Sequence, residues 1–488
     1  MTFDFIKNLA RRVKGMFSSS LMKSVAEVAQ NESIISDRMM AAIDLWTEMF
    51  SGNPPWLKDN SQSLELPAIV ASEIARQVTL EMDVNFSGSD MADYISEQFK
   101  NVIRDIRPNT EYACACGGIV FKPYIYDNKI ITEIVHADVF YPVAFDNAQK
   151  ITAAYFIYRK WDNRKVYSRL EKHELKGKTY IITNTAYVSA VEESLGKRCE
   201  LTDVAEWSNI QPETVIQDIE APLFAYFKIP FGNTIDKRSP LGVSVYARAI
   251  GLIREADKQF QRLMWEYEGG ELAIDASEDA FRRVNGEPML PEGKERLYRT
   301  NNLDSASTHG DMLMKEWAPS LRDSNYMTGL NRLLMQIEDA CCLSRGTLSD
   351  PSVAARTATE IKIMKQRSYA TITDIQKSLE MSLRDLAYAM YCLAVLYDLA
   401  PDGDYEMQFV WDDSVIVDAE AERIRDQQEV AQGLMLPWEY RVKWYGEDEA
   451  TAKKKLGEIE DMSDDEILGF NEPEENEGNI KDQKSEAK

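Results

Sequence analysis

The chain has 488 residues, of which 44% are hydrophobic and 28% are charged, and its formal net charge is −25 at pH 7. Such a chain can bury a substantial core, and its length suits two to four domains or one large core with insertions. The acidic excess excludes tight wrapping of DNA or RNA around a broad basic face, although nucleic acid could still slide past without being gripped.

The residue types that most often build catalytic or metal centres are scarce. Only three histidines occur in the chain, so a His-centred site is not expected. The six cysteines should be reduced thiols, because two pairs are too close in sequence for a secreted disulfide framework. We expect Cys114 and Cys116 to share one face of a strand and Cys341 and Cys342 to lie in a helix, as buried thiols rather than zinc ligands. The remaining two are Cys199 and Cys392.

The first 23 residues are basic and amphipathic, and their apolar residues recur at roughly helical spacing. A continuous apolar stretch of signal-peptide length is missing. We expect a helix over 3–17 that docks on the protein or on a partner, with a membrane surface as the less favoured alternative. No apolar run of about 18 residues occurs, so no membrane span is expected.

Residues 1–110 are predicted to be mostly helical, with a break at Pro54-Pro55 and a buried helix in the segment LPAIVASEIARQVTLEMDV. Residues 112–230 favour antiparallel strands, because short runs rich in Ile, Val, Tyr and Phe alternate with Asp-Asn, Gly-Lys or Asn-rich turns. Helix returns over 241–269, after Pro240, and ends at Gly269-Gly270.

A mixed insert with short strands, such as ELAID and ERLYRT, occupies 271–318, and a second helix is predicted over roughly 321–343. A polar loop of small residues, RGTLSDPSVAARTA, follows it. Residues 358–399 then lack Pro and Gly, and their apolar residues recur at helical steps, which predicts a helix of about 40 residues, or roughly 60 Å. Such a rod is typical of a large ring or a coiled coil; the alternative is a bent core helix of a large α-domain.

The C-terminal region is predicted to begin with a strand at YEMQFVWDD. Residues 416–458 favour helix with an interruption near 433–437, and the acidic segment 461–488 is expected to be disordered.

Tests for catalytic and cofactor motifs fail. Gly177-Lys178-Thr179 lacks the earlier glycine of a phosphate loop, since that position is Lys172, and a turn between strands is expected there. None of the histidines, His136, His173 and His309, has a nearby set of partners. Asp412-Asp413 could bind a divalent cation, although a turn after a strand is favoured. No cofactor is expected, and a metal-dependent nuclease stays open only because carboxylates are abundant.

Basic residues mark the two central helices and the polar loop. Arg254, Lys258 and Arg262 share one helical face because they are four residues apart. This basic stripe could contact a passing anion, or it could form ordinary ion pairs with the interleaved acids Glu255, Asp257, Glu266 and Glu268. The other basic candidates, on the second helix and beside the loop, are Arg322, Arg332, Arg345 and Arg356.

The order of these segments resembles the portal proteins of the long-tailed double-stranded DNA phages. Four stretches carry the resemblance. ACACGGIVFKPYIYDN with IVHADVFYPVAFDN is similar to the family's wing strands, and IPFGNTIDKRSPLGVSVYARAIGLIREADKQF to the entry into its stem. RTATEI is similar to the junction between loop and long helix, and DDSVIVDAEAERIRDQQEVAQGLMLPWEYRVKWYGEDEATAKKKL to the crown segment. The likeness covers about residues 20–458.

The resemblance implies an α+β fold with a helical stem and crown, a strand-rich wing and a small α/β clip, assembled as a ring. Carried onto this sequence, it divides the chain as follows: N-terminal helices and wing 1–240, first stem helix 241–269, clip 270–320, second stem helix 321–344, tunnel loop 345–357, long wing helix 358–399, crown 400–460 and acidic tail 461–488.

The function implied by the resemblance is a conduit for DNA rather than an enzyme. It implies a homo-oligomeric ring, usually of about twelve subunits, at one capsid vertex of the virion, assembled in the host cytoplasm. Double-stranded DNA would pass through it during packaging by the terminase large subunit and during ejection. Further implied partners are the major capsid protein, the scaffold and the head-completion or neck proteins.

Physical reasoning is compatible with that role. A mostly acidic lumen repels phosphates, while a few basic rings give transient contacts. The seven basic residues named above are therefore candidates for lining the channel. Two alternatives remain: another minor head or scaffold protein that uses the long helix without closing a ring, and a metal-dependent hydrolase acting on nucleic acid.

Overall fold

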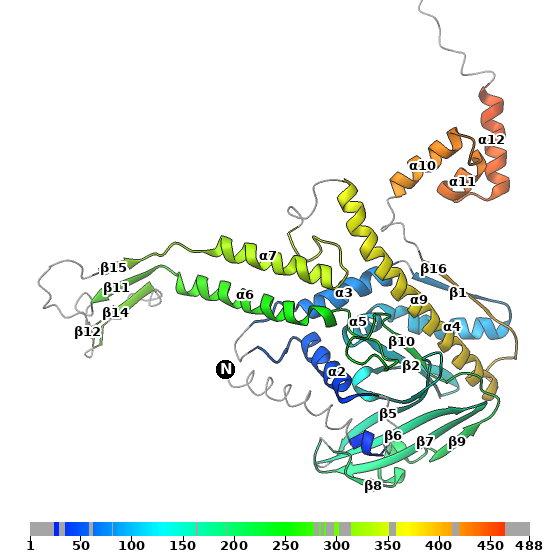
Figure 1. Ribbon diagram of the computed structural model, residues 1–488. Coiled ribbons are helices and arrows are strands. Elements are labelled where there is room, and N and C mark those ends of the chain that lie inside the picture. The colour runs from blue at the N-terminus through cyan, green and yellow to red at the C-terminus, as the bar shows by residue number, and fades with distance from the viewer. Residues whose placement is uncertain are drawn as a thin grey trace, which may run out of the picture. The chain divides into compact units, whose positions relative to one another are not determined.

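The computed structural model describes residues 24–28, 35–57, 62–80, 82–162, 164–192, 194–277, 283–284, 287–288, 297–301, 314–350, 358–411 and 419–463. The chain forms two compact units, Met1–Trp411 and Asp412–Lys488. Helices and sheets are both abundant, which confirms the predicted α+β class (Figure 1). Within the described ranges, no helix combines the length and the apolar character that a membrane crossing needs.

The helices of the first unit gather in its N-terminal part, in a central pair and in one long helix. Their bounds are α2 Asp37–Phe50, α3 Leu66–Val78, α4 Asp90–Arg104, α5 Ile106–Cys116, α6 Ile250–Gly269, α7 Asp323–Ala340 and α9 Ala358–Leu396.

The strands that the structure describes in the first unit form five sheets. Their bounds are β1 Met82–Ser87, β2 Gly118–Tyr126, β3 Lys129–His136, β4 Phe140–Phe145, β5 Ile151–Asp162, β6 Lys165–Lys176, β7 Thr179–Ser189, β8 Lys197–Cys199, β9 Glu213–Ile216, β10 Ala225–Lys228, β11 Ala273–Ser277, β12 Arg283–Val284, β13 Glu287–Pro288, β14 Tyr298–Asn301, β15 Met314–Trp317 and β16 Glu406–Trp411.

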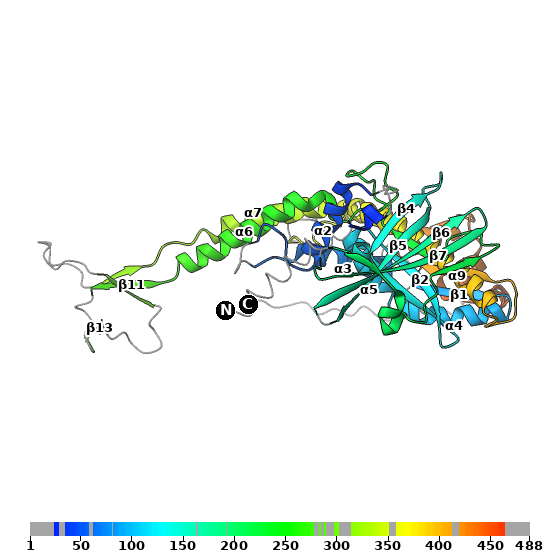
Figure 2. The same ribbon diagram turned by 90° about the horizontal axis from the view of Figure 1, so that it is seen from below.

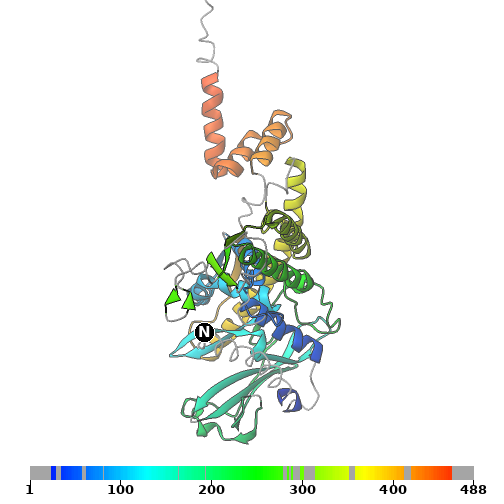
Figure 3. The same cartoon turned by 90° about the vertical axis from the view of Figure 1, so that its left-hand side faces the viewer.

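The largest sheet is antiparallel and has six strands, in the order β4-β5-β6-β7-β8 with β9 also paired to β7. Its long hairpins follow from alternating apolar and polar residues between tight turns. Gly177 makes the turn between β6 and β7 with a φ of 64°, so the Gly-Lys-Thr segment is a hairpin turn, as predicted. Figure 3 looks along α6 and α7, with the strands of this sheet (teal) below them.

A three-stranded sheet, β10-β2-β3, joins the six-stranded sheet to the helices. The prediction that Cys114 and Cys116 lie on a strand is wrong, because both are the last residues of α5. The helix ends at Gly117, whose φ is 89°, and β2 begins only at Gly118. A Cβ at Gly117 would lie 2.6 Å from the carbonyl oxygen of Gly242, so only glycine permits this close backbone approach.

The same approach explains why α6 begins later than predicted. Residues 241–249 were expected to be helical, but α6 begins at Ile250, after a short 3₁₀ turn at Ala247–Ala249. The backbone N–H of Val245 donates to the carbonyl of Cys114 at 3.0 Å instead of to a helical turn. Val243, Val245 and Tyr246 are thereby buried against α5, so this segment serves the core rather than the helix.

Helix α9 confirms the predicted long helix and ends at Leu396. Its described side chains from Ser368 onward pack into the first unit. Ser378 donates to the carbonyl of Lys228 on β10 at 2.5 Å, and Gln376 donates to the carbonyl of Val78 on α3 at 3.4 Å. The predicted apolar face is buried at Ile372, Ile375, Leu379, Leu383, Leu386, Met390 and Leu393. The side chains of Ile361 and Met364 lie outside the described ones.

Strand β16 pairs with β1 in antiparallel register, with Met82 opposite Trp411 and Ser87 opposite Glu406. The strand at 406–411 was predicted, but β1 was not, because residues 1–110 were expected to be mostly helical. Residues of β1 alternate between partly buried and exposed, as one face of a two-stranded ladder requires.

The described part of the second unit, residues 419–463, contains the helices α10 Ala419–Ala431, α11 Pro437–Tyr445 and α12 Glu449–Ser463. The break predicted at 433–437 is present, and Pro437 begins α11. Asp426 of α10 accepts hydrogen bonds from Trp444 at 2.9 Å and from Lys443 at 2.7 Å, which ties α10 to α11. The first residues of the predicted disordered tail are helical, since α12 runs to Ser463. The remainder of the tail, Asp412-Asp413 and the segment 3–17 lie outside the described residues.

Candidate functional site

Helices α6 and α7 lie side by side and lead to the small sheet β14-β11-β15 (Figures 1 and 2). Leu263 of α6 and Leu330 and Ile337 of α7 are buried between or beneath them. Gln259 donates to the carbonyl of Tyr326 at 3.4 Å, opposite Gly329. These contacts hold the two helices together as a pair. Six of the seven predicted basic residues lie on the pair or directly beside it, so we consider it as the candidate channel segment.

At the far end of the pair, where α6 ends and α7 begins, an ion pair between Glu266 and Arg322 joins the two helices. Three donors of Arg322, its backbone N–H, Nε and Nη2, reach the Glu266 carboxylate at 3.1, 3.0 and 2.7 Å. These hydrogen bonds from Arg322 hold the pKa of Glu266 below its ordinary value. Arg322 therefore fastens α7 to α6, and its charge is already partnered within the chain.

The basic stripe of α6 is present on one exposed face, but two of its three members are paired. Glu255 accepts from Lys258 at 2.9 Å and lies 3.4 Å from Arg254. The hydrogen bond from Lys258 lowers the pKa of Glu255. Arg262 is exposed and has no ion pair with any residue that the structure describes.

Asp257 does not belong to this surface, although the sequence places it among the interleaved acids. Its side chain is buried and accepts hydrogen bonds from Trp56 Nε1 at 2.9 Å, from Ser63 Oγ at 3.3 Å and from the Leu64 N–H at 3.0 Å. Asp257 thus anchors α6 to the segment that precedes α3. The sequence offered one indication: Asp257 lies one helical turn after Ile253 and directly after Ala256, and both of these residues are on the buried face of the helix.

Arg332 of α7 is exposed and has no ion pair in the described part of the chain. It lines an open groove of about 870 Å³ together with Met327, Leu334 and Leu348. Arg345 is paired with Asp339 at 2.8 Å, and Arg356 lies outside the described residues. Of the six predicted basic residues that the structure describes, Arg262 and Arg332 are therefore those left without an anionic partner among the described residues.

The predicted helix over 321–343 also ends earlier than expected. α7 ends at Ala340, Cys341 is its cap, and Cys342 has a φ of 60°, so the chain reverses there. After this reversal, backbone N–H groups within residues 346–349 donate hydrogen bonds to the side chain of Glu338, which is completely buried. Neither Glu338 nor Asp257 was recognised from the sequence, because a buried carboxylate in an acidic chain looks like any solvated one.

A buried polar network lies between the six-stranded sheet and the β10-β2-β3 sheet. Lys122 of β2 contacts Glu171 at 2.8 Å and Glu133 at 3.3 Å, while Arg169 contacts Glu171 at 2.9 Å. His173 contacts Glu171 at 2.7 Å and Tyr180 at 2.8 Å. Lys122 and His173 are both buried within this cluster of titratable groups.

The protonation states of this network are set by opposing effects. Burial alone would raise the pKa of Glu171, but the hydrogen bond from His173 and the charges of Lys122 and Arg169 hold it well below its ordinary value. Burial lowers the pKa of His173 despite that same contact. The groups neutralise one another inside a closed interface, which favours a structural role over acid–base chemistry.

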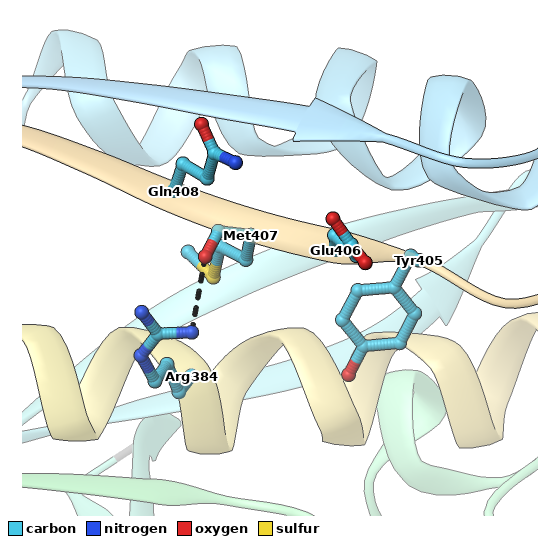
Figure 4. Close-up of a pocket in the computed structure, with 5 residues that line it drawn as sticks. All are labelled: Arg384, Tyr405, Glu406, Met407 and Gln408. Carbon is cyan, nitrogen blue, oxygen red and sulfur yellow. Dashed lines mark hydrogen bonds between the residues drawn. The ribbon is translucent and has the colours of Figure 1, made fainter.

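The thiols and a second cavity give no indication of a catalytic centre. All six cysteines are free, and burial raises the pKa of Cys116 to about 12. No group of three possible metal ligands occurs among the residues described. A cavity of about 440 Å³ lies beside β16, but its Arg384 already donates to the Met407 carbonyl at 3.1 Å (Figure 4). The same side chain also donates to Glu380. That arginine connects α9 to β16.

Comparison with known families identifies the chain. No curated protein sequence matches it significantly. The family described as "Phage portal protein, SPP1 Gp6-like" matches residues 84–467, which is well over half of the chain and includes the α6–α7 pair, α9 and helices α10 to α12. The resemblance inferred from the sequence is confirmed: the chain belongs to the phage portal protein family.

Proposed function

We propose that this protein forms a ring at one capsid vertex, through which double-stranded DNA enters during packaging and leaves during ejection. Family membership supports a portal role and a capsid-associated oligomer. Proteins of this family are structural, and the proposal assigns no catalytic step to the chain. The terminase would drive the DNA, while the ring would guide it.

The observation that carries the proposal is a group of large apolar side chains left in solvent at the far end of the α6–α7 pair. Trp265 of α6 is 67% exposed, and Trp317 and Leu321 lie beside the same junction, where Leu321 contacts Gly270. Exposed apolar surface of this kind marks an interface. Neighbouring copies in a ring would cover it. Its members are Trp265, Leu272, Trp317, Leu321 and Met327.

Charge supports the same arrangement. In a ring of about twelve copies, every side chain is repeated at one height, so Arg262 and Arg332 would each become a ring of positive charges. The rest of the chain is acidic, with a net charge of −25. Phosphates would be repelled over most of the lumen and contacted briefly at these rings, which lets a polyanion pass without binding tightly.

We assign the segments accordingly. α6 and α7 would form the stem, residues 270–320 the clip that meets the terminase and later the neck proteins, and residues 345–357 the tunnel loop. The six-stranded sheet, the β10-β2-β3 sheet and α9 would form the wing beside the major capsid protein, with residues 400–460 as the crown. The acidic tail has no assigned role.

The test is assembly of the purified chain. Native mass measurement should give a particle close to about twelve times 55.7 kDa, and end-on electron micrographs should show a central hole. A Trp265→Glu variant should stay smaller than the ring, because a charge cannot be buried in an apolar contact. Trp161→Glu is the matched control, since Trp161 is also exposed but lies on β5. A chain that stays a single copy at high concentration would contradict the proposal.

A further inference from the structure

The carboxylate of Glu338, near the end of α7, is surrounded by donors from the segment that follows the helix. Oε1 accepts from the backbone N–H groups of Leu348 at 2.6 Å, Ser349 at 2.8 Å and Gly346 at 3.1 Å. Oε2 accepts from the Ser349 hydroxyl at 2.8 Å. Four donors from three loop residues, Gly346, Leu348 and Ser349, thus converge on one fully buried side chain.

A second contact shows that the segment runs back along α7. Asn331, two helical turns before Glu338, accepts from the backbone N–H of Asp350 at 2.8 Å. The reversal needs positive φ angles at Cys342 (60°) and Gly346 (88°). Residues 346–350 therefore lie along the helix from Glu338 toward Asn331, rather than projecting freely from its end.

The contact with Glu338 is strong because of its chemistry. Hydrogen bonds to an ionised acceptor are stronger than those between neutral groups, and they strengthen further away from water. No lysine or arginine in the described structure forms an ion pair with Glu338, so the loop itself supplies the compensation for the buried charge. Pulling the loop away would leave a buried carboxylate without partners, which is costly.

We propose that Glu338 is a positioning residue that fixes residues 346–350 to α7, so that this part of the loop follows the helix as one body. The consequence for DNA rests on the proposed function: in the ring, the height at which the tunnel loop enters the channel would be set by α7 through Glu338. A shift of the helix would then move the loop directly, without an independent hinge at residue 346.

Hydrogen exchange on the full-length protein tests the inference directly. In Glu338→Gln, the neutral amide keeps one oxygen for the three N–H groups but loses the negative charge that strengthens those hydrogen bonds, so exchange over 346–350 should accelerate by at least about tenfold. Exchange in α6 should stay unchanged. Asp339→Asn is the matched control: it removes the neighbouring carboxylate and its ion pair with Arg345, but it touches none of these N–H groups. Unchanged exchange in Glu338→Gln would overturn the proposal.

Two milder variants keep the test decisive if Glu338→Gln does not fold. Ser349→Ala removes one donor to Glu338, and Asn331→Ala removes the acceptor for Asp350. Each should accelerate exchange over 346–350 by roughly threefold; no acceleration in either variant would refute the proposal.

DNA retention in assembled particles separates this inference from the proposed function. Faster exchange in Glu338→Gln, together with native rings that never conduct DNA, would refute the proposed function alone. Normal exchange in rings that conduct DNA would refute the positioning role alone.

Discussion

The sheets around Lys122 and the α6–α7 pair differ in how far their charged side chains are buried and paired. Between the sheets, charges are buried and paired with one another, as Lys122, Arg169 and His173 are with Glu171. Along the helix pair, Arg262 and Arg332 lack described partners and Trp265 is mostly in solvent. The sheet region completes its own interactions, whereas the helix pair leaves surface for other molecules. Predictions on the two regions should therefore differ in size and in kind.

The largest effect is expected in the sheet network. Lys122→Met removes a buried cation and leaves Glu171 and Glu133 with less compensation, which should lower the free energy of unfolding by about 3–5 kcal/mol. Urea denaturation measures the change. Lys178→Met is the matched control, because the ion pair between Lys178 and Glu220 is fully exposed on the same sheet and should contribute almost nothing. Equal losses in both variants would mean that burial does not distinguish them.

An intermediate effect is expected where α6 joins the body. Asp257→Ala leaves the partly buried donors of Trp56 and Leu64 without their acceptor and should lower the free energy of unfolding by about 2 kcal/mol. Asp257→Asn retains one carbonyl acceptor and should lose less. Thermal unfolding followed by far-UV circular dichroism measures the loss of stability in both variants. If the two variants lose the same stability, the hydrogen bonds to Asp257 are not what holds α6 in place.

The smallest effect is expected at Glu266 and Arg322, because Arg322 is largely exposed. Since the folded-state pKa of Glu266 is lowered, the contribution of the pair is present above the ordinary carboxyl pKa of about 4.3 and is lost as the pH falls through the folded-state value. The stability difference between the native protein and Arg322→Met should therefore narrow on acidification. Melting temperatures measured at neutral and acidic pH would show this; a difference that persists at low pH would assign the role of Arg322 to packing.

Much of the architecture could be predicted from local sequence. Alternating residues between Asp-Asn and Gly-Lys turns identified the long hairpins, and the uninterrupted apolar period after 358 identified α9. Both signals are local, since each depends on the spacing of neighbouring residues. The order of these elements was also enough to recognise the family.

The errors occur where distant contacts override local preference. Gly117 and Gly242 meet backbone to backbone, which leaves Cys114 and Cys116 in a helix and residues 241–249 out of one. A single sequence carries no signal for that meeting. For the same reason, charge alone could not show that Asp257 and Glu338 are buried while Glu255 is exposed, because only the tertiary fold decides which carboxylates lose water.

The pairing of β1 with β16 has a consequence for synthesis. Next to it, the Ser89 hydroxyl donates to the carbonyl of Asp404, a contact that spans 315 positions. On the ribosome, β1 emerges long before its only ladder partner in the described chain, so one strand edge waits unpaired while most of the polypeptide is translated. Such an edge can recruit a wrong strand from another nascent chain. The brevity of β1 and its single inward-facing row of side chains limit how firmly such a mismatched pair could hold.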